Sequence, residues 1–233
     1  MTSMPGLSHT TESTGRVSVV IGRTDPGSKR EFSVRYRAPM TLLDVLFEIQ
    51  RAQDASLAFR FFCRAGLCGT CTVRHNGAPV LACQTAVAAD SRIRIDPLGG
   101  LPVIRDLVVD LEPFTTAWAA AVRQSTPTGV RRDGFGDDTR LEMHRDAREC
   151  IACAACYSAC PVTGSDETFA GPAALGRKSL IAIDARLADT AASEAAGASS
   201  DVAGCHSVGA CSIVCPRGVD PARLIRRLRR LGR

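Results

Sequence analysis

The stretch "CIACAACYSACP" (150–161) decides what the second half of this chain can fold into. Its cysteines follow the spacing C-x2-C-x2-C-x3-C and end in proline, which is the run that holds iron–sulfur clusters in bacterial ferredoxins. A second stretch, "CHSVGACSIVCP" (205–216), repeats this spacing, except that Val208 stands where a cysteine is expected. The two runs therefore predict a helical domain built around a pair of clusters.

In two-cluster proteins of this kind, the fourth cysteine of each run binds the other cluster. This crosswise rule predicts a 4Fe–4S cluster on Cys150, Cys153, Cys156 and Cys215, and a second cluster on Cys160, Cys205 and Cys211. The second set lacks a thiolate at Val208, and a cube corner without a ligand loses its iron readily. We therefore expect a 3Fe–4S cluster there, since an aliphatic side chain would also exclude outside ligands. The alternative is a four-iron cluster completed by water or by a carboxylate such as Asp201.

A third group of cysteines lies in the first half of the chain. The sequence "CRAGLCGTC" (63–71) and a later cysteine give the plant-type pattern for a 2Fe–2S cluster. The predicted ligands are Cys63, Cys68, Cys71 and Cys83. Gly66 and Gly69 suit a loop that needs positive φ angles close to inorganic sulfide. The alternatives are a zinc site or unrelated buried thiols, but zinc sites usually combine two close cysteine pairs, and only one is present here.

The composition favours an intracellular metal-binding protein. The chain has 233 residues, enough for one or two domains, and its eleven cysteines are clustered and odd in number. No N-terminal apolar leader and no apolar segment of bilayer length is evident. We therefore expect a reducing compartment, where clustered cysteines usually bind metal.

The net charge of +5 is concentrated at the C-terminus, where "PARLIRRLRRLGR" (221–233) holds six arginines. Aromatic residues make up only 5% of the chain and no nucleic-acid motif is present, so we expect no nucleic-acid partner. The arginines fit an acidic partner surface or anionic lipid headgroups, or else a solvated helix face. The apolar stripe opposite them fits either a membrane anchor or packing on its own domain; it contains Leu224, Ile225, Leu228 and Leu231.

Periodicity predicts the local structure of the first half. Strands are expected within 17–37, with a turn at "PGS" (26–28), and again at 91–96. A helix is expected over 41–53, beginning at a Thr41–Asp44 capping box, and a hairpin over 71–83 is expected to turn at Asn76–Gly77. The predicted organisation is a disordered tail (1–15), a small α+β domain (16–105), a connecting segment (106–139) and a helical domain (140–233).

These motifs occur in order with "NGAPVLAC" (76–83), "PVIRDLVVDLEPF" (102–114) and "FAGPAAL" (169–175). Because it carries these motifs in this order, the chain resembles the iron–sulfur subunits of succinate dehydrogenases and fumarate reductases. The resemblance extends over about residues 16–233. The resemblance implies an α+β protein in which a β-grasp plant-type ferredoxin domain precedes an all-α, bacterial-type two-cluster ferredoxin domain. It also implies that 2Fe–2S, 4Fe–4S and 3Fe–4S clusters form a wire.

The same resemblance implies the partners. The wire would run from the FAD of a flavoprotein subunit, which interconverts succinate and fumarate, to a quinone held against membrane-anchor subunits with or without haem b. The chain would then lie peripherally on the cytoplasmic face of the cell membrane. Pro161, His206 and Val208 match positions that border the quinone pocket. His206 would hydrogen-bond the quinone or pass a proton, or would be a structural histidine bonded to backbone.

One departure concerns the type of quinone. Ubiquinone-linked relatives carry a tryptophan a few residues after the proline that matches Pro161, whereas this chain reads "CPVTGSDETF" (160–169). The only tryptophan, Trp118, is far away in the sequence. The resemblance is thus to menaquinone-linked members. Two other functions stay open: an electron-transfer partner of a different, soluble flavoprotein without quinone chemistry, and a free-standing carrier or iron sensor.

Overall fold

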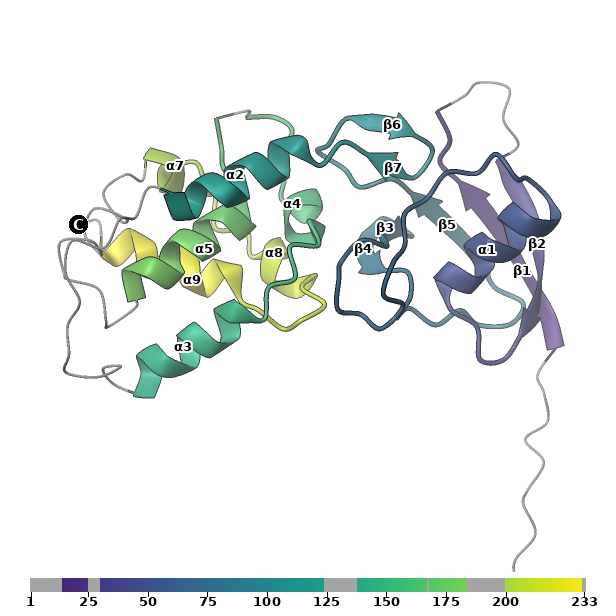
Figure 1. The fold of residues 1–233 in the computed structure, drawn as a ribbon, viewed down its shortest axis with the longest axis horizontal. Helices are drawn as coiled ribbons and strands as arrows, with labels where there is room; N and C mark the ends of the chain where they lie inside the picture. The colour runs from purple at the N-terminus through teal and green to yellow at the C-terminus, as the bar shows by residue number, and fades with distance from the viewer. Residues whose placement is uncertain (1–13, 25–29, 124–137, 167, 184–199, 232–233) are drawn as a thin grey trace, which may run out of the picture.

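The computed structural model describes residues 14–24, 30–123, 138–166, 168–183 and 200–231. A half built on a sheet and a half built of helices lie next to one another (Figure 1). The α+β class predicted from the sequence is confirmed, with the sheet first and the helices second along the chain. Among the helices in these ranges, none is both long enough and apolar enough to cross a membrane.

The first half is a mixed five-stranded sheet in the order β2-β1-β5-β3-β4. Its strands are β1 (Thr14–Ile21), β2 (Glu31–Arg37), β3 (Thr72–His75), β4 (Ala78–Leu81) and β5 (Arg92–Asp96). β1 pairs with β2 in antiparallel and with β5 in parallel orientation, while β3 runs antiparallel to β4 and β5. The predicted turn at 26–28 lies outside the described residues.

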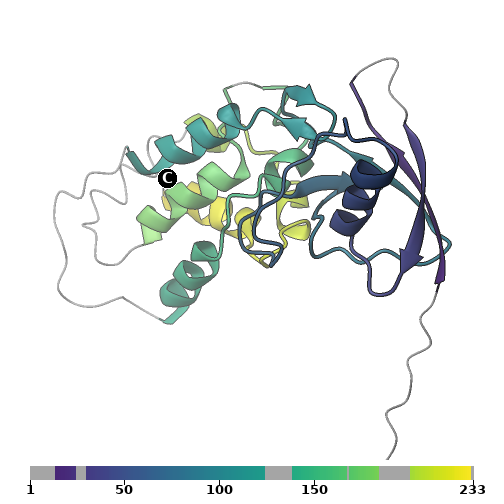
Figure 2. The ribbon, with the colours of Figure 1, turned by 45° about the vertical axis from the view of Figure 1, so that its right-hand side comes forward.

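Helix α1 (Leu42–Ala52) packs against this sheet (Figure 2). The predicted capping box is present: the Asp44 amide donates to Thr41 Oγ1 over 3.3 Å, and the Thr41 amide donates to the Asp44 carboxylate over 2.8 Å. The inward face of the helix is fully buried and comprises Leu42, Val45, Leu46 and Ile49. It meets the alternate apolar side chains of β1, which fixes the helix across the sheet.

A buried ion-pair network joins separate segments of the sheet domain. Arg23, just after β1, pairs with Asp54 after α1 and donates Nε to Asp106 Oδ1 over 2.9 Å. The side chains of Arg23 and Asp106 are completely buried. Asp106 also accepts the Ala58 amide over 2.9 Å, so three separate chain segments meet at this one carboxylate.

A small hairpin leads into the helical half. Strands β6 (Val103–Arg105) and β7 (Val108–Val109) span the predicted boundary at residue 105. Helix α2 (Glu112–Arg123) follows and occupies part of the predicted connecting segment, and 124–137 lie outside the described residues. The further helices are α3 (Asp138–Arg148), α4 (Ala155–Ala159), α5 (Pro172–Ile183), α7 (Ser200–Ala203), α8 (Ala210–Ile213) and α9 (Pro221–Leu231).

Helices α5 and α9 form the centre of the helical half (Figure 1). The apolar stripe of α9 is buried at Leu224, Ile225 and Leu228, and the Ser179 hydroxyl of α5 donates to the Leu224 carbonyl over 3.2 Å. Of the two alternatives for this stripe, packing on its own domain is therefore the observed one. The α9 residues Arg223, Arg226 and Arg230 face solvent.

Candidate metal centres

The loop before β3 gathers the first group of cysteines. The Ala65 and Leu67 amides both donate to Cys63 Sγ over 3.4 Å, and these hydrogen bonds lower the pKa of the Cys63 thiol to about 6. Gly66 and Gly69 have φ angles of 72° and 70°, which allow the loop to turn its amides inward. Backbone amides aimed at a cysteine sulfur are a feature of iron–sulfur loops.

Cys71 and Cys83 complete this group from the start of β3 and the end of β4. Both are buried, and burial raises the pKa of the Cys71 thiol to about 11. Cys71 lies close enough to Cys83 and Cys68 for their charges to interact. The structure thus places all four predicted 2Fe–2S ligands around one loop and one hairpin.

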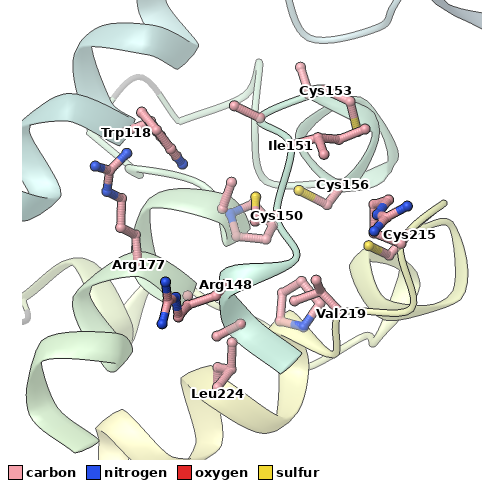
Figure 3. A pocket seen from close by; sticks show the side chains of 18 of the residues that line it. Trp118, Arg148, Cys150, Ile151, Cys153, Cys156, Arg177, Cys215, Val219 and Leu224 are labelled. Atoms are coloured by element: carbon pink, nitrogen blue, oxygen red, sulfur yellow. The ribbon is translucent and has the colours of Figure 1, made fainter. Parts of the chain in front are cut away.

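A cavity of about 240 Å³ opens in the helical half (Figure 3). Four cysteines line it, and they are the set that the crosswise rule assigned to one cluster: Cys150, Cys153, Cys156 and Cys215. Helix α4 begins inside this run, because Ala154 takes a left-handed conformation with φ 59°. That turn places cysteines on both sides of the helix start, around the same space.

When deprotonated, the thiolates that line this cavity repel one another. Burial raises the pKa of Cys153 to about 11 and that of Cys156 well above its ordinary value, and neighbouring thiolates add to both effects. Cys150 and Cys215 both contribute to the rise at Cys153. Positive charge from iron would offset this repulsion, as expected when metal binding is coupled to deprotonation of the ligands.

Cys160, the fourth cysteine of the run, does not line this cavity. It caps α4 in an extended conformation, with ψ 126°, because the following Pro161 disfavours helical backbone at the residue before it. A second, smaller cavity contains Cys160 together with Cys205 and Cys211. The proline thus separates the fourth cysteine of the run from the first three, and the two cavities divide these seven cysteines into the same two sets as the crosswise rule.

The positions matched to a quinone pocket surround the second cavity. Pro161, His206 and Val208 all line it and are exposed to solvent. The side chain of Asp201, the alternative ligand, lies outside what the structure describes. Val208 is 63% exposed and faces the cavity from the position where the missing cysteine was expected.

The three cysteine groups lie in succession. A Cβ atom at Gly69 would be only 2.6 Å from Cys153 Cβ, so the first loop packs directly on the second group. Cys68 and Cys153 also line a shared cavity. On the other side, Cys156 interacts electrostatically with Cys211 of the third group. The second cysteine group therefore lies between the first and the third.

The cysteines of the helical half line cavities and do not meet around a single-ion site. Within the described ranges, no group of three or more His, Cys, Asp or Glu side chains could hold a single metal ion. The larger cavity, about 240 Å³, has room for a body larger than an ion, and cysteines line both cavities. This donor set fits iron–sulfur clusters.

Sequence reasoning missed the side chains other than cysteine that line the larger cavity, and two of them are Trp118 and Arg177. Trp118 comes from α2 and Arg177 from α5, two helices that pack against each other (Figure 3). Neither belongs to a cysteine motif, and the only signal available was that Trp118 is the single tryptophan of the chain.

Comparisons with known proteins agree with this arrangement. Residues 19–116 match the 2Fe-2S iron-sulfur cluster binding domain, and residues 146–219 match the 4Fe-4S dicluster domain. A solved structure, the Mycobacterium smegmatis Sdh1 complex in the apo form, contains a chain with a TM-score of 0.78 at 24% identity. The match covers 94% of this chain and 95% of that chain, and it shows the same fold.

Curated relatives are more similar in sequence. The fumarate reductase iron-sulfur subunit of Mycobacterium tuberculosis is 37% identical over 203 residues, covering 82% of each chain. The corresponding subunit of Haemophilus influenzae is 34% identical, covering 83% of this chain and 82% of its own. A fumarate reductase (CoM/CoB) protein of Methanothermobacter marburgensis is 34% identical over 91% of this chain and 44% of its own length. This chain belongs to the family of iron–sulfur electron-transfer subunits of succinate dehydrogenases and fumarate reductases.

Proposed function

We propose that this chain carries single electrons between the FAD of a flavoprotein subunit, which interconverts succinate and fumarate, and a menaquinone-type quinone at a membrane. The observation that carries the proposal is the succession of cysteine groups, with Gly69 packed on Cys153 and Cys156 next to Cys211. Electron transfer needs its centres close together, and this packing brings each group against the next.

Each group would hold one cluster. The ligands are Cys63, Cys68, Cys71 and Cys83 for 2Fe–2S; Cys150, Cys153, Cys156 and Cys215 for 4Fe–4S; and Cys160, Cys205 and Cys211 for 3Fe–4S. The clusters supply one-electron chemistry when bound. The chain supplies the ligands, the hydrogen bonds to sulfur and the spacing between sites.

Val208 favours a three-iron cluster at the last site. Its side chain lines the second cavity in the place of a ligand and offers no donor atom to a fourth iron. A hydrocarbon group there also blocks a water molecule from that position. The 3Fe–4S assignment follows from this substitution and from the three sulfurs that share the cavity.

The quinone end of the relay is the surface around this cavity. Pro161, His206 and Val208 are exposed there, and Ile213 of α8 is 84% exposed nearby in sequence. Exposed apolar side chains beside a cluster site fit contact with a membrane anchor, with or without haem b. His206 would then donate a hydrogen bond to a quinone oxygen. The chain would lie peripherally on the cytoplasmic face of the cell membrane.

The flavoprotein end is the surface around the 2Fe–2S loop. Phe62 is 79% exposed and Leu67 is 61% exposed, and both lie within or beside the run that begins at Cys63. Large apolar side chains exposed next to a redox site fit a protein interface. The two apolar surfaces thus belong to the first and last cluster sites.

The test is anaerobic purification of the tagged chain with its native partners, followed by assays with two kinds of acceptor. We expect succinate oxidation with a low-potential naphthoquinone analogue and with an artificial dye. His206→Ala should lower the quinone rate and leave the dye rate unchanged, whereas His75→Ala, a histidine in the sheet domain, should change neither. Absence of succinate oxidation with any acceptor would contradict the proposal.

A second candidate is favoured by one observation. The Methanothermobacter relative, whose name specifies CoM/CoB, aligns with 91% of this chain. A soluble flavoprotein oxidoreductase without quinone chemistry would fit such a likeness. Copurification of a flavoprotein without any membrane protein, with no quinone activity, would favour this function.

A further inference from the structure

Two side chains outside the ligand set act on the larger cavity. The guanidinium carbon of Arg177 lies 3.3 Å from the centroid of the Trp118 ring, so the cation rests on the face of the indole. The indole N–H of Trp118 donates to the sulfur of Cys150. Figure 3 shows both side chains beside Cys150 at one edge of the cavity.

Arg177 brings a positive charge to the edge of the cavity. Its Nη1 atom is buried and makes no hydrogen bond to any residue that the structure describes. A buried guanidinium keeps its proton under all ordinary conditions, so its charge needs compensation from within the site. The thiol of Cys150 is close enough for its charge to interact with Arg177. An anionic group in the cavity would supply a partner for this Nη1 atom.

A cluster bound by four thiolates is such a group. It carries net negative charge, and reduction adds one more negative charge to it. Hydrogen bonds to cluster sulfurs and the net charge of the surroundings set cluster reduction potentials. A nearby cation and an N–H donor both stabilise the reduced form more than the oxidised form, because the reduced form is the more negative.

We propose that Trp118 and Arg177 form a potential-tuning pair that raises the reduction potential of the 4Fe–4S cluster, the middle centre of the relay. The inference rests on the proposed ligand set of that cluster. Trp118 acts directly through its hydrogen bond to the Cys150 sulfur, and it also holds the guanidinium against the edge of the cavity. Arg177 acts through its positive charge.

The arrangement depends on two helices that carry no ligands. Trp118 lies on α2 and Arg177 on α5, and the packing of these helices brings the pair to the cavity. The potential of the middle centre is thereby controlled separately from the loops that bind it. Raising this potential favours electron transfer out of the 2Fe–2S site into the middle site.

The experiment is an anaerobic redox titration of the cluster-loaded complex, followed by electron paramagnetic resonance. Trp118→Phe removes the N–H and keeps an aromatic ring, Arg177→Met removes the charge and keeps the length, and Arg177→Lys keeps the charge. We expect the first two each to reduce the equilibrium constant for reduction of the 4Fe–4S cluster roughly tenfold, a decrease of about 59 mV. Arg177→Lys should show a smaller decrease.

The 2Fe–2S and 3Fe–4S signals serve as internal references, and their potentials should not move. Arg145→Met is the matched control, because it removes an exposed arginine that does not line the cavity, and it should leave all three potentials unchanged. A 4Fe–4S potential equal to wild type in both Trp118→Phe and Arg177→Met would overturn the proposal. So would an equal shift of all three clusters.

If the Arg177→Met variant fails to bind the cluster, the 4Fe–4S potential of Trp118→Phe alone tests the proposal. Trp118→Phe is suited to this because it keeps an aromatic ring beneath the arginine. Absence of a four-iron signal in the wild-type protein would instead refute the ligand set, so the two failures are distinguishable.

Discussion

Replacing Gly69 with alanine tests the contact that joins the first two cluster sites. Gly69 has a φ of 70°, and the added Cβ would lie 2.6 Å from Cys153 Cβ and 2.7 Å from Cys153 Cα. Neither atom can rotate away, because one is backbone and the other is fixed to it. The two segments must therefore separate by about 1 Å to reach the roughly 3.5–4.0 Å at which carbon atoms pack.

Two costs add in this variant. Left-handed backbone at alanine costs about 1–2 kcal/mol. Overpacking against Cys153 costs a further ~1–3 kcal/mol, the range seen for overpacked cores. Gly77→Ala is the matched control, since Gly77 also has a positive φ, 90°, and no atom lies within 4 Å of the added Cβ. Only the first cost applies there.

The assay is the thermal unfolding midpoint of the cluster-loaded protein, measured anaerobically. We expect Gly69→Ala to unfold about 2–12 °C below Gly77→Ala. Electron transfer from the 2Fe–2S to the 4Fe–4S cluster should also be slower in Gly69→Ala, because tunnelling weakens with distance. Equal midpoints and equal transfer rates in the two variants would refute the direct packing of these sites.

Three further predictions follow from other parts of the molecule. Val208→Cys supplies the missing thiolate, so the oxidised three-iron resonance should disappear and a second reduced four-iron signal should replace it; a persistent three-iron signal would contradict the role of Val208. Asp106→Asn leaves the buried Arg23 under-paired and should destabilise the protein by about 3–5 kcal/mol, seen as a lower thermal midpoint, whereas an unchanged midpoint would show that this network contributes little. Phe62→Asp should weaken binding to the flavoprotein by about 2 kcal/mol, roughly 30-fold, and unaltered affinity in a titration would exclude this surface as the interface.

The parts of the fold that could be predicted from sequence are those with local signals. The Thr41–Asp44 capping box and the apolar face of 41–53 predicted α1, and Asn76–Gly77 predicted the β3–β4 hairpin, where both residues have positive φ. Cysteine spacing grouped the thiols, because Pro161 acts on its immediate neighbour. The ligand assignments themselves stay predictions.

The parts that escaped prediction depend on contacts between distant segments. Helix α4 begins at a left-handed alanine, Ala154, for which residue propensity gives no signal. The pairing of Arg23 with Asp106 joins segments far apart in the chain. Trp118 and Arg177 likewise meet only because α2 packs on α5, and no motif links them.

The most direct test of the central claim is the iron, sulfide and zinc content of the anaerobically isolated chain. Three clusters on eleven cysteines require about nine iron atoms and about ten acid-labile sulfides per chain, with no stoichiometric zinc. Zinc in place of iron, or iron and sulfide enough for only one cluster, would contradict the account.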